Sequence, residues 1–334
     1  MKIAVIGAGA IGGVTAAFMG RSGIDVTLVC KRRSIADTVR ESGLHIVGKR
    51  GEHSIRLKAV ADISELEEKY DYCLIATKAY DLEGAAERIL PFLTPEGLVV
   101  SLQNGICIDT LTRIAGSERA IGAVVTWSCT TLGEAMLEIT GEGSFIIGRI
   151  GGGSDGRLEK LREAMDKAAP TTISDDILGA MYSKLIINSG ITCGGAMTGQ
   201  LLGKMLAGRR ARLFFIHIVK EDMRVADAMG LKVPPFGGKL DYYRFIRGNT
   251  LLSKLRRHAI LFLVGLKYRK LKSSSLTSLQ LGGKTEVDYL NGWIARKGDE
   301  LNIQTPVNDR VVGIIKEIEA GQRKISPGNL SEIL

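Results

Sequence analysis

The sequence has few cysteines, and none of them are paired. Five are spread singly along the chain, with no CxxC pair and no histidine at the spacing of a metal site. This pattern argues against a disulfide framework and predicts no metal centre. We expect small buried hydrophobic side chains in a reducing cytoplasm. The cysteines are Cys30, Cys73, Cys107, Cys129 and Cys193.

The sequence also lacks the pattern of a secretion signal and that of a membrane-spanning segment. Residues 1–6 lead directly into glycines, not into an apolar region with a small-residue cleavage site. The apolar run at 259–264 is far shorter than the ~18 residues that a spanning helix needs. Both observations agree with a cytoplasmic protein.

Low-complexity tracts and internal repeats are absent, and there are only seven prolines. With 45% hydrophobic and 24% charged residues, the composition is that of a globular protein. A chain of 334 residues exceeds the size at which single cores stop growing, so we expect two domains.

Positive charge is in excess, with a net charge of +9. Clustered cations attract nucleic acids and membranes, but anionic small substrates explain the excess equally well. Much of the excess surrounds the apolar run at 259–264, where a helix buried against its own domain is favoured over one that lies on a membrane or faces a partner. We expect a small-molecule partner, no nucleic acid and no membrane, with a homodimer as the alternative use of this run. The cations are Arg247, Lys254, Arg256, Arg257, Lys267, Arg269, Lys270 and Lys272.

Apolar strands and helices alternate through the first half of the chain. Residues 2–6 and 25–30 are expected strands joined by a helix at 14–21, which makes a βαβ unit. The alternation predicts an α/β domain at 1–174, a Rossmann-type doubly wound parallel sheet. Further strands are expected at 72–76, 98–102, 120–126, 144–148 and 171–174, and further helices at 82–90, 108–114 and 157–167.

The alternation stops near residue 175. Long helical patterns occupy 177–196, 213–229 and 286–301. Pro234 and Pro235 lie between the second and the third of these patterns and must end a helix there. We therefore expect a mainly helical domain at 175–334 for substrate binding and dimerisation.

A glycine-rich turn follows the first strand. Gly7 would permit the tight turn, Gly9 would let the backbone approach a pyrophosphate, and Gly12 would allow close helix packing. The strand before it and the helix after it make this GxGxxG specific for a dinucleotide, with the phosphates at the helix N-terminus. The predicted cofactor-binding residues here are Gly7, Ala8, Gly9, Ala10, Ile11 and Gly12.

The end of the second strand distinguishes the two nicotinamide cofactors. NAD sites carry an acidic residue there, which accepts hydrogen bonds from the ribose. This chain has Lys31, Arg32 and Arg33 instead, which favours the 2′-phosphate of NADPH over a merely solvated basic turn.

Five segments together resemble the 2-dehydropantoate 2-reductase (ketopantoate reductase) family, in order and over nearly the whole chain. The resemblance implies reduction of 2-dehydropantoate by NADPH to (R)-pantoate, a step toward pantothenate and coenzyme A. The segments are the turn at 7–12, Thr77-Lys78-Ala79, Gln103-Asn104-Gly105, Lys184-Leu185-Ile186-Ile187-Asn188 and the run at 285–292.

The resemblance also implies roles for individual residues. Lys184 matches the catalytic lysine, Glu286 the carboxylate that supports it, and Asn188 a substrate-binding amide. Lys78 and Asn104 match positions that line the cofactor and active site, and Lys31 matches the position that binds the adenosine phosphate. The family's substrate-binding serine falls at Ser274 or Ser275, since the run Ser273-Ser274-Ser275 leaves two registers.

The chemistry agrees with these roles. Hydride delivery to a ketone leaves negative charge on oxygen, and Lys184 can both stabilise and protonate that oxygen. A free lysine has a pKa of about 10.4, so burial or a lowered pKa would make it a better acid. Glu286 would act against that change, which suggests orientation as its main task. Without the resemblance, an interhelical salt bridge would explain Lys184 and Glu286, and a buried structural amide would explain Asn188.

Two features depart from the family pattern. Thr192 stands where members that reduce ketopantoate tend to carry a second asparagine, and a hydroxyl reaches less far than an amide. The stretch at 235–272 is longer and more basic than usual. Two alternatives therefore remain: a reductase of another bulky 2-oxo acid or an opine-type dehydrogenase, and a non-catalytic NADPH-binding regulatory protein.

Overall fold

The chain forms two compact units in a computed structural model that describes residues 1–333. The first consists of Met1–Gln103 and Cys107–Met181, and the second of Asn104–Ile106 and the residues from Tyr182 onward. The division lies inside helix α6 (Ile177–Ile187), whereas the domain boundary predicted at 174/175 precedes that helix.

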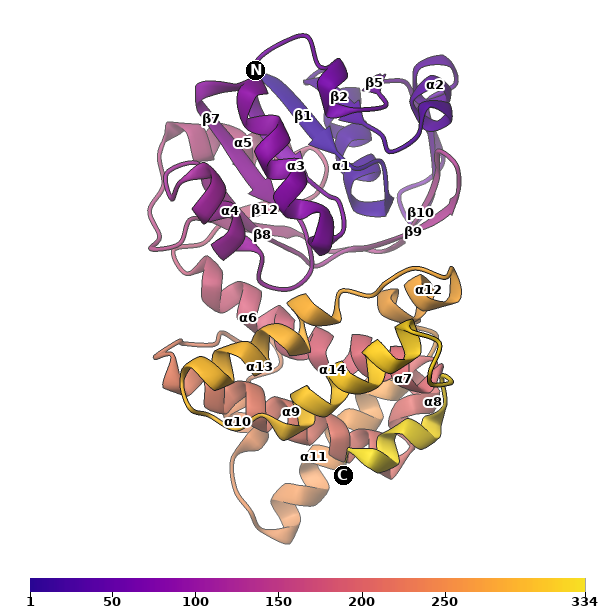
Figure 1. Cartoon of the computed structure of the whole chain (residues 1–334), viewed down its shortest axis with the longest axis vertical. Coiled ribbons are helices and arrows are strands. Elements are labelled where there is room, and N and C mark those ends of the chain that lie inside the picture. Colours follow the sequence, from indigo (N-terminus) through magenta and orange to yellow (C-terminus); the bar gives the residue numbers. More distant parts are fainter. Residues whose placement is uncertain (334) are drawn as a thin grey trace. The chain divides into compact units, whose positions relative to one another are not determined.

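The first unit is built on an eight-stranded sheet (Figure 1). All its strand pairs are parallel except β8 with β11, which confirms the predicted parallel sheet. The order is β12 (Thr171–Ile173), β11 (Phe145–Gly148), β8 (Ala120–Val125), β7 (Leu93–Ser101), β6 (Tyr70–Ile75), β1 (Lys2–Ile6), β2 (Asp25–Val29) and β5 (Lys58–Val60).

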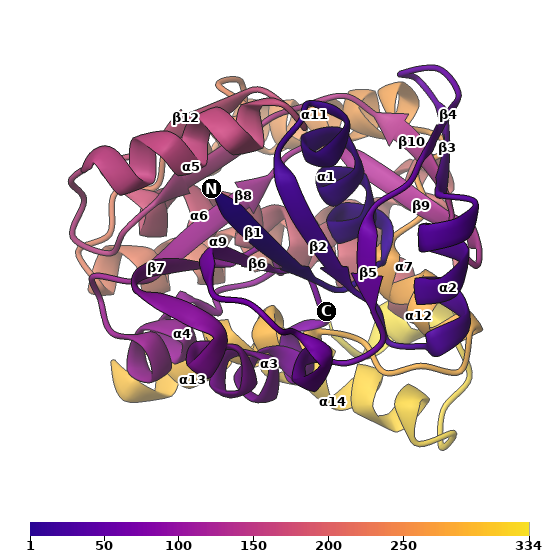
Figure 2. The same ribbon diagram turned by 90° about the horizontal axis from the view of Figure 1, so that it is seen from above.

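Helices cover both faces of this sheet. Figure 2 shows α1 (Ala10–Arg21) and α5 (Gly156–Asp166) on one face, and α3 (Leu82–Ile89) and α4 (Ile108–Ala115) on the other. Strands β2 and β6 lie on opposite sides of β1, and the strand order reverses there. The sheet is therefore doubly wound, with its switch point at β1. Helix α2 (Arg33–Glu41) packs beside β5.

A small second sheet in this unit has no counterpart in the sequence prediction. It has the order β4 (His53–Ile55), β3 (Leu44–Gly48), β10 (Met136–Gly141) and β9 (Ser128–Gly133). Strand β9 is exposed along most of its length and carries no alternating apolar pattern. Leu137 and Ile139 of β10 nevertheless join the core of the unit.

The second unit is helical, as predicted. Its long central helix α9 packs against α8, α10, α11, α13 and α14. The elements are α6, the π-helical turn η4 (Asn188–Thr192), α7 (Cys193–Thr198), α8 (Leu202–Ala207), α9 (Arg209–Ala228), α10 (Tyr242–Ile246), α11 (Leu251–Lys267), α12 (Ser274–Gln280), η5 (Val287–Tyr289), α13 (Asn291–Glu300), α14 (Pro306–Glu319) and η6 (Pro327–Glu332).

Two of the predicted helices are interrupted. The expected helix at 177–196 is α6, the π-helical turn η4 and α7 in succession. The expected helix at 286–301 is broken at Leu290, whose φ of −107° and ψ of −104° are not helical. Helix α9 ends at Ala228, before Pro234 and Pro235.

The expectation that the basic helix is buried against its own domain is wrong for most of its surface. Only Arg257, Leu261 and Gly265 of α11 are buried. Among residues 1–333, no helix combines the length and apolarity needed to cross a membrane. All five cysteines are free thiols, and four are buried as expected, while Cys129 is half-buried.

Candidate active site

The glycine turn lies at the switch point of the sheet. Gly7 has a φ of +109°, and a Cβ there would lie 2.9 Å from the Ala76 carbonyl oxygen. A Cβ at Gly12 would overlap the Gly7 carbonyl oxygen, whereas a Cβ at Gly9 would meet nothing within 4 Å. Helix α1 begins after Gly9 with no side-chain cap and no acidic residue in its first turn. This turn therefore presents amide groups beside open space, which suits an anionic ligand.

The parallel strands end at one edge, which brings the predicted strand-end residues of the first unit to that edge. Ile6 of β1 is in register with Val29 of β2 and Ile75 of β6. Lys31 follows β2, and Lys78 follows β6 as a half-buried residue. Because these positions follow aligned strand ends, they flank the glycine turn.

Two of the three cations after β2 are held in ion pairs. The Arg33 guanidinium donates to both Glu65 oxygens, over 2.8 and 2.5 Å, and Arg32 Nη1 lies 2.7 Å from Glu134 Oε1. Lys31 is exposed and makes no ion pair with any residue in 1–333. Glu134 lies between β9 and β10, a hairpin that the sequence pattern does not predict, so its pairing with Arg32 could not be foreseen.

In the helical unit, Lys184, Asn188 and Thr192 follow one another along α6 and η4. Thr192 Oγ1 donates to Asn188 Oδ1 over 3.4 Å. The Asn188 Nδ2 group is buried and has no hydrogen-bond partner in the described chain. A buried amide that is held at its oxygen and unpartnered at its nitrogen is suited to donate to a bound ligand.

The π-helical turn that carries Asn188 is held by close packing. A Cβ at Gly190 would overlap the Phe215 ring of α9, so glycine lets α9 approach the turn. Asn291 Nδ2 donates to the Ser189 carbonyl oxygen over 3.4 Å and to Asn308 Oδ1 over 2.8 Å. Single π turns within α-helices are frequent at functional sites.

Two adjacent buried carboxylates anchor Asn308. Glu221 accepts from the Asn308 backbone NH over 3.0 Å and from Asn308 Nδ2 over 2.9 Å, and it also accepts from the Val307 NH over 3.0 Å. Asp222 Oδ1 accepts from Asn308 Nδ2 over 3.0 Å. Burial raises the pKa of Asp222 well above its ordinary value, while the Asn308 hydrogen bond opposes this and Glu221 adds to it. This network could not be predicted from the sequence, because its members are far apart in the chain.

The electrostatics of Lys184 are those of a usable acid. Burial lowers the pKa of Lys184 to about 8, and the negative charge of Glu286 opposes that shift. Glu286 is itself 6% exposed and precedes η5. Its neighbour Thr285 donates to Glu319 Oε1 from its backbone NH and its hydroxyl, over 2.8 and 2.7 Å, which fixes this segment on α14.

The three serines at 273–275 have different surroundings at the start of α12. Ser273 Oγ accepts from the Leu276 NH over 3.1 Å and so caps the helix. Ser274 is exposed and Ser275 is buried. Helix α12, which begins with both serines, packs against α7 and against η4, the turn that carries Asn188 and Thr192.

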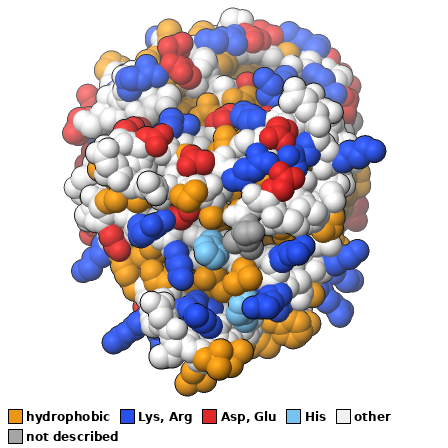
Figure 3. Space-filling view, turned by 60° about the horizontal axis from the view of Figure 1, so that its bottom comes forward, with side chains coloured by type: hydrophobic (Ala, Val, Ile, Leu, Met, Phe, Trp, Pro, Cys, Tyr) orange, Lys and Arg blue, Asp and Glu red, His pale blue; other side chains and the backbone are white. Residues whose placement is uncertain are grey.

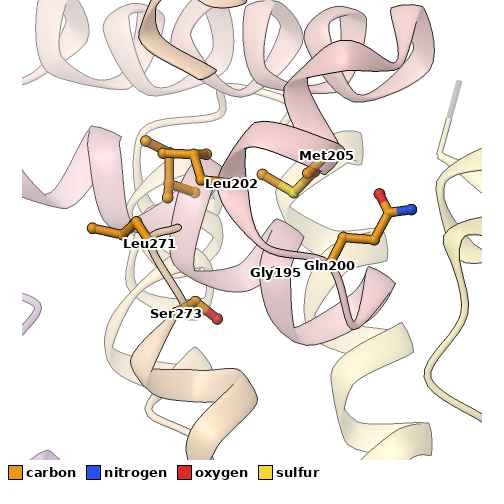
Figure 4. A pocket seen from close by; sticks show the side chains of 7 residues that line it. Gly195, Gln200, Leu202, Met205, Leu271 and Ser273 are labelled. Carbon is orange, nitrogen blue, oxygen red and sulfur yellow. The ribbon is translucent and has the colours of Figure 1, made fainter. Parts of the chain in front are cut away.

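A small hollow beside this contact is lined by both apolar and polar residues. Figure 4 shows Leu202, Met205 and Leu271 around it, with Gln200 and the Ser273 hydroxyl at its side. Among the described residues that line it, none has a titratable side chain, and Ile191 belongs to the turn that carries Asn188.

Asn104 belongs to the helical unit although it follows β7. The next residue, Gly105, has a φ of +85°, and a Cβ there would overlap the Tyr289 carbonyl oxygen. Asn104 therefore lies next to η5, the turn that Glu286 precedes. The structure thus brings together Asn104 with Glu286, and Lys184 with Asn188 and Thr192.

A doubly wound sheet with a glycine turn at its switch point, followed by a helical unit with a lysine of lowered pKa, is the architecture of a Rossmann-type oxidoreductase. Two family models match the chain, "Ketopantoate reductase PanE/ApbA" over residues 3–152 and its C-terminal counterpart over 176–319. The chain belongs to the ketopantoate reductase family.

Relatives named 2-dehydropantoate 2-reductase match this chain over nearly its full length. A 2-dehydropantoate 2-reductase of Pyrococcus abyssi is 29% identical over 97% of this chain and 100% of its own. The corresponding protein of Pyrococcus horikoshii is 26% identical over 96% of this chain and 98% of its own.

Solved structures show the same fold. A PanE/ApbA family ketopantoate reductase from Ralstonia eutropha JMP134 has a TM-score of 0.82 and 27% identity, and the match covers 97% of this chain and 100% of that one. D-mandelate dehydrogenase, solved with NADH and anilino(oxo)acetate, has a TM-score of 0.83 and 23% identity over 96% of this chain and 99% of its own. At that identity the second likeness concerns the fold alone.

Proposed function

We propose that this protein reduces 2-dehydropantoate to (R)-pantoate with NADPH in the cytoplasm, with Lys184 as the general acid. The observation that carries the proposal is the pairing of a lysine whose pKa is lowered to about 8 with the unpartnered buried amide of Asn188, one helical turn away. Membership of the family and the names of the curated relatives support the substrate.

Each side chain has a defined task in this reaction. The bound nicotinamide cofactor supplies a hydride to the keto carbon. Lys184 stabilises the negative charge that develops on the keto oxygen and gives that oxygen a proton, which completes the secondary alcohol. Glu286 holds the Lys184 ammonium in place, and Asn188 Nδ2 donates to the substrate. Thr192, Ser274, Ser275 and Asn104 complete the proposed substrate site.

The glycine turn and the first strand ends form the proposed cofactor site. The open space at Gly9 and the uncapped first turn of α1 fit a pyrophosphate. Lys31 and Arg32 are proposed to bind the 2′-phosphate of NADPH, with Lys78 beside the cofactor. Glu134 already neutralises Arg32 and therefore competes with that phosphate.

Replacing Glu134 tests the phosphate site. We expect Glu134→Gln to tighten NADPH binding about fivefold at low ionic strength and to leave NADH binding unchanged, because it frees Arg32 for the phosphate. Fluorescence titration with both cofactors measures this. Glu87→Gln, an exposed carboxylate of the same unit, is the matched control. Equal changes for NADPH and NADH would contradict the assignment.

A second candidate is reduction of another bulky 2-oxo acid by the same residues. Thr192 favours it, because its hydroxyl binds Asn188 Oδ1 and offers less reach to substrate than a second asparagine would. The fold shared with D-mandelate dehydrogenase is compatible with it.

A substrate panel separates the two candidates. NADPH oxidation at 340 nm is measured with 2-dehydropantoate and with aromatic and branched 2-oxo acids, with NADH as the cofactor control. Turnover of 2-dehydropantoate far above the other acids supports the first candidate, and the opposite order supports the second. Lys184→Ala should abolish turnover while NADPH still binds; turnover by neither the native protein nor the variant would favour a regulatory protein.

We also propose that the chain divides into a nucleotide-binding domain at 1–174 and a substrate-binding domain at 175–334. We further propose that the protein is a homodimer. The matched ranges 3–152 and 176–319 support the division.

A further inference from the structure

Helix α11 exposes a continuous apolar stripe. At 100° per residue, seven apolar side chains fall within one arc of about 120°. Leu251 and Leu252 are 74% and 77% exposed, and Leu263 is 62% exposed. The stripe, here called the α11 stripe, consists of Leu251, Leu252, Leu255, Ala259, Phe262, Leu263 and Leu266.

The size of the stripe is unusual for a surface that faces only water. Its leucines and Phe262 expose on the order of 600 Å², the upper limit for patches on monomers and close to the roughly 800 Å² per partner of a standard interface. Figure 3 shows hydrophobic side chains gathered at one end of the molecule, with Lys and Arg side chains beside them.

The opposite side of α11 fixes the helix rigidly. Leu261 and Gly265 are buried where α11 packs on α8 and α9, and a Cβ at Gly265 would lie 2.9 Å from Leu206 Cβ. Arg257 is 2% exposed, and its guanidinium donates to the carbonyls of Ile246 and Gly248 over 3.1 and 2.9 Å. The backbone that carries the stripe is thus already ordered, and binding has to order only its side chains.

The charges beside the stripe decide between two occupants. Residues 242–285 contain ten Lys and Arg and no Asp or Glu, which alone would suit an anionic lipid surface. Two of the cations at its border, however, are engaged within the chain. Arg256 donates to the carbonyls of Arg244 and Arg247 over 2.8 and 3.2 Å, and Lys267 Nζ lies 5.3 Å from the Tyr268 ring centre. These intramolecular contacts make the two cations less available to lipid phosphates.

We propose that the α11 stripe is the contact between two copies of this chain, paired helix to helix about a twofold axis. The exposed area matches one half of a standard interface, and Ala259 in the middle of the stripe allows two helices to approach closely. Because the flanking charges are of one sign, screening by salt strengthens this dimer, whereas it weakens attachment to an anionic membrane.

Sedimentation velocity on the full-length protein tests the proposal. We expect a species of twice the 36.0 kDa chain mass at about 10 μM, with a dissociation constant that falls at least twofold between 50 mM and 500 mM NaCl. The double variant Leu255→Arg/Leu263→Arg should sediment as a monomer. Leu281→Arg, at a position 81% exposed and outside the stripe, should remain a dimer.

Further measurements distinguish loss of the dimer contact from misfolding of the arginine variant. Ala259→Cys should form a covalent dimer under mild oxidation, and Leu281→Cys should not. A wild-type monomer at about 100 μM, or a dimer that the double arginine variant leaves intact, would overturn the proposal. So would pelleting of the protein with phosphatidylcholine–phosphatidylserine vesicles that 500 mM NaCl reverses, since that behaviour identifies a lipid surface as the occupant.

Discussion

At the scale of single residues, the surroundings of a side chain determine its chemistry more than its identity does. The motif predicts Lys184 as the catalytic lysine, but its lowered pKa depends on burial that only the fold supplies. The surroundings also give Ser273 a structural role, because its hydroxyl caps α12, while Ser274 and Ser275 both remain candidates for the substrate-binding serine. The pair formed by Arg32 and Glu134 could not be predicted, since the two residues lie about a hundred positions apart and meet only through a hairpin.

The pH dependence of the reaction is the prediction that belongs to this scale. If the Lys184 ammonium is the proton donor, kcat/KM for reduction stays level below pH 7 and falls tenfold per pH unit above about 8. The negative charge of Glu286 raises the pKa of Lys184, so Glu286→Gln should move the falling limb to lower pH. Initial rates from pH 6 to 10 measure both effects.

Asp299→Asn, which neutralises an exposed carboxylate of the same unit, serves as the control and should leave the limb in place. A limb that stays in place in Glu286→Gln would show that the two charges are not coupled in the reaction.

At the scale of elements, the sequence predicts those helices and strands whose apolar residues recur at a regular spacing. All strands of the main sheet except β5, together with helices α1, α3, α4 and α5, can be predicted because buried parallel strands and helices carry clear patterns. Strands β9 and β10 were missed because β9 is mostly exposed. The run at 177–196 is apolar throughout, so its hydrophobicity gives no sign that the middle is a π-helical turn.

The π-helical turn can be tested through Gly190. We expect Gly190→Ala to displace the turn, because the added methyl group overlaps the Phe215 ring, and so to misplace Asn188. KM for the 2-oxo acid should rise about tenfold, equivalent to roughly 1.4 kcal/mol, while NADPH affinity stays the same. Steady-state kinetics and cofactor titration measure the two quantities.

Gly84→Ala on α3 is the matched substitution, since a Cβ at Gly84 meets nothing within 4 Å. It should leave KM unchanged. A similar rise in KM for both variants would remove the special role assigned to the turn.

At the scale of the whole molecule, the buried carboxylates couple global stability to pH. Asp222 keeps its proton in the folded chain well above the pH at which an unfolded aspartate ionises. The folded state therefore binds more protons in that interval, and the free energy of unfolding falls as pH rises from about 4 toward the raised pKa, by at most about 1.4 kcal/mol per pH unit. This coupling could not be predicted from the sequence, because two acids on an apolar helix pattern look like exposed residues.

Urea unfolding at several pH values tests this coupling. Asp222→Asn should flatten the decline, because an amide cannot ionise and still accepts from Asn308. Asp227→Asn, at an exposed position of the same helix, should decline as the native protein does. Parallel declines in all three proteins would assign the pH dependence to other groups.

The π-helical turn also has a consequence for how this chain can change over generations. A π turn accommodates one residue more than the α-helical path around it. Loss of a single codon within 188–192 would restore an ordinary helix, and the segments on either side would keep their orientation because the turn itself takes up the extra residue. The side chains within 188–192, among them Asn188 and Thr192, would then change direction relative to α6 and α7 in one genetic step. Single-residue insertions and deletions at this turn are thus a short route by which a family with one reaction can acquire different substrates.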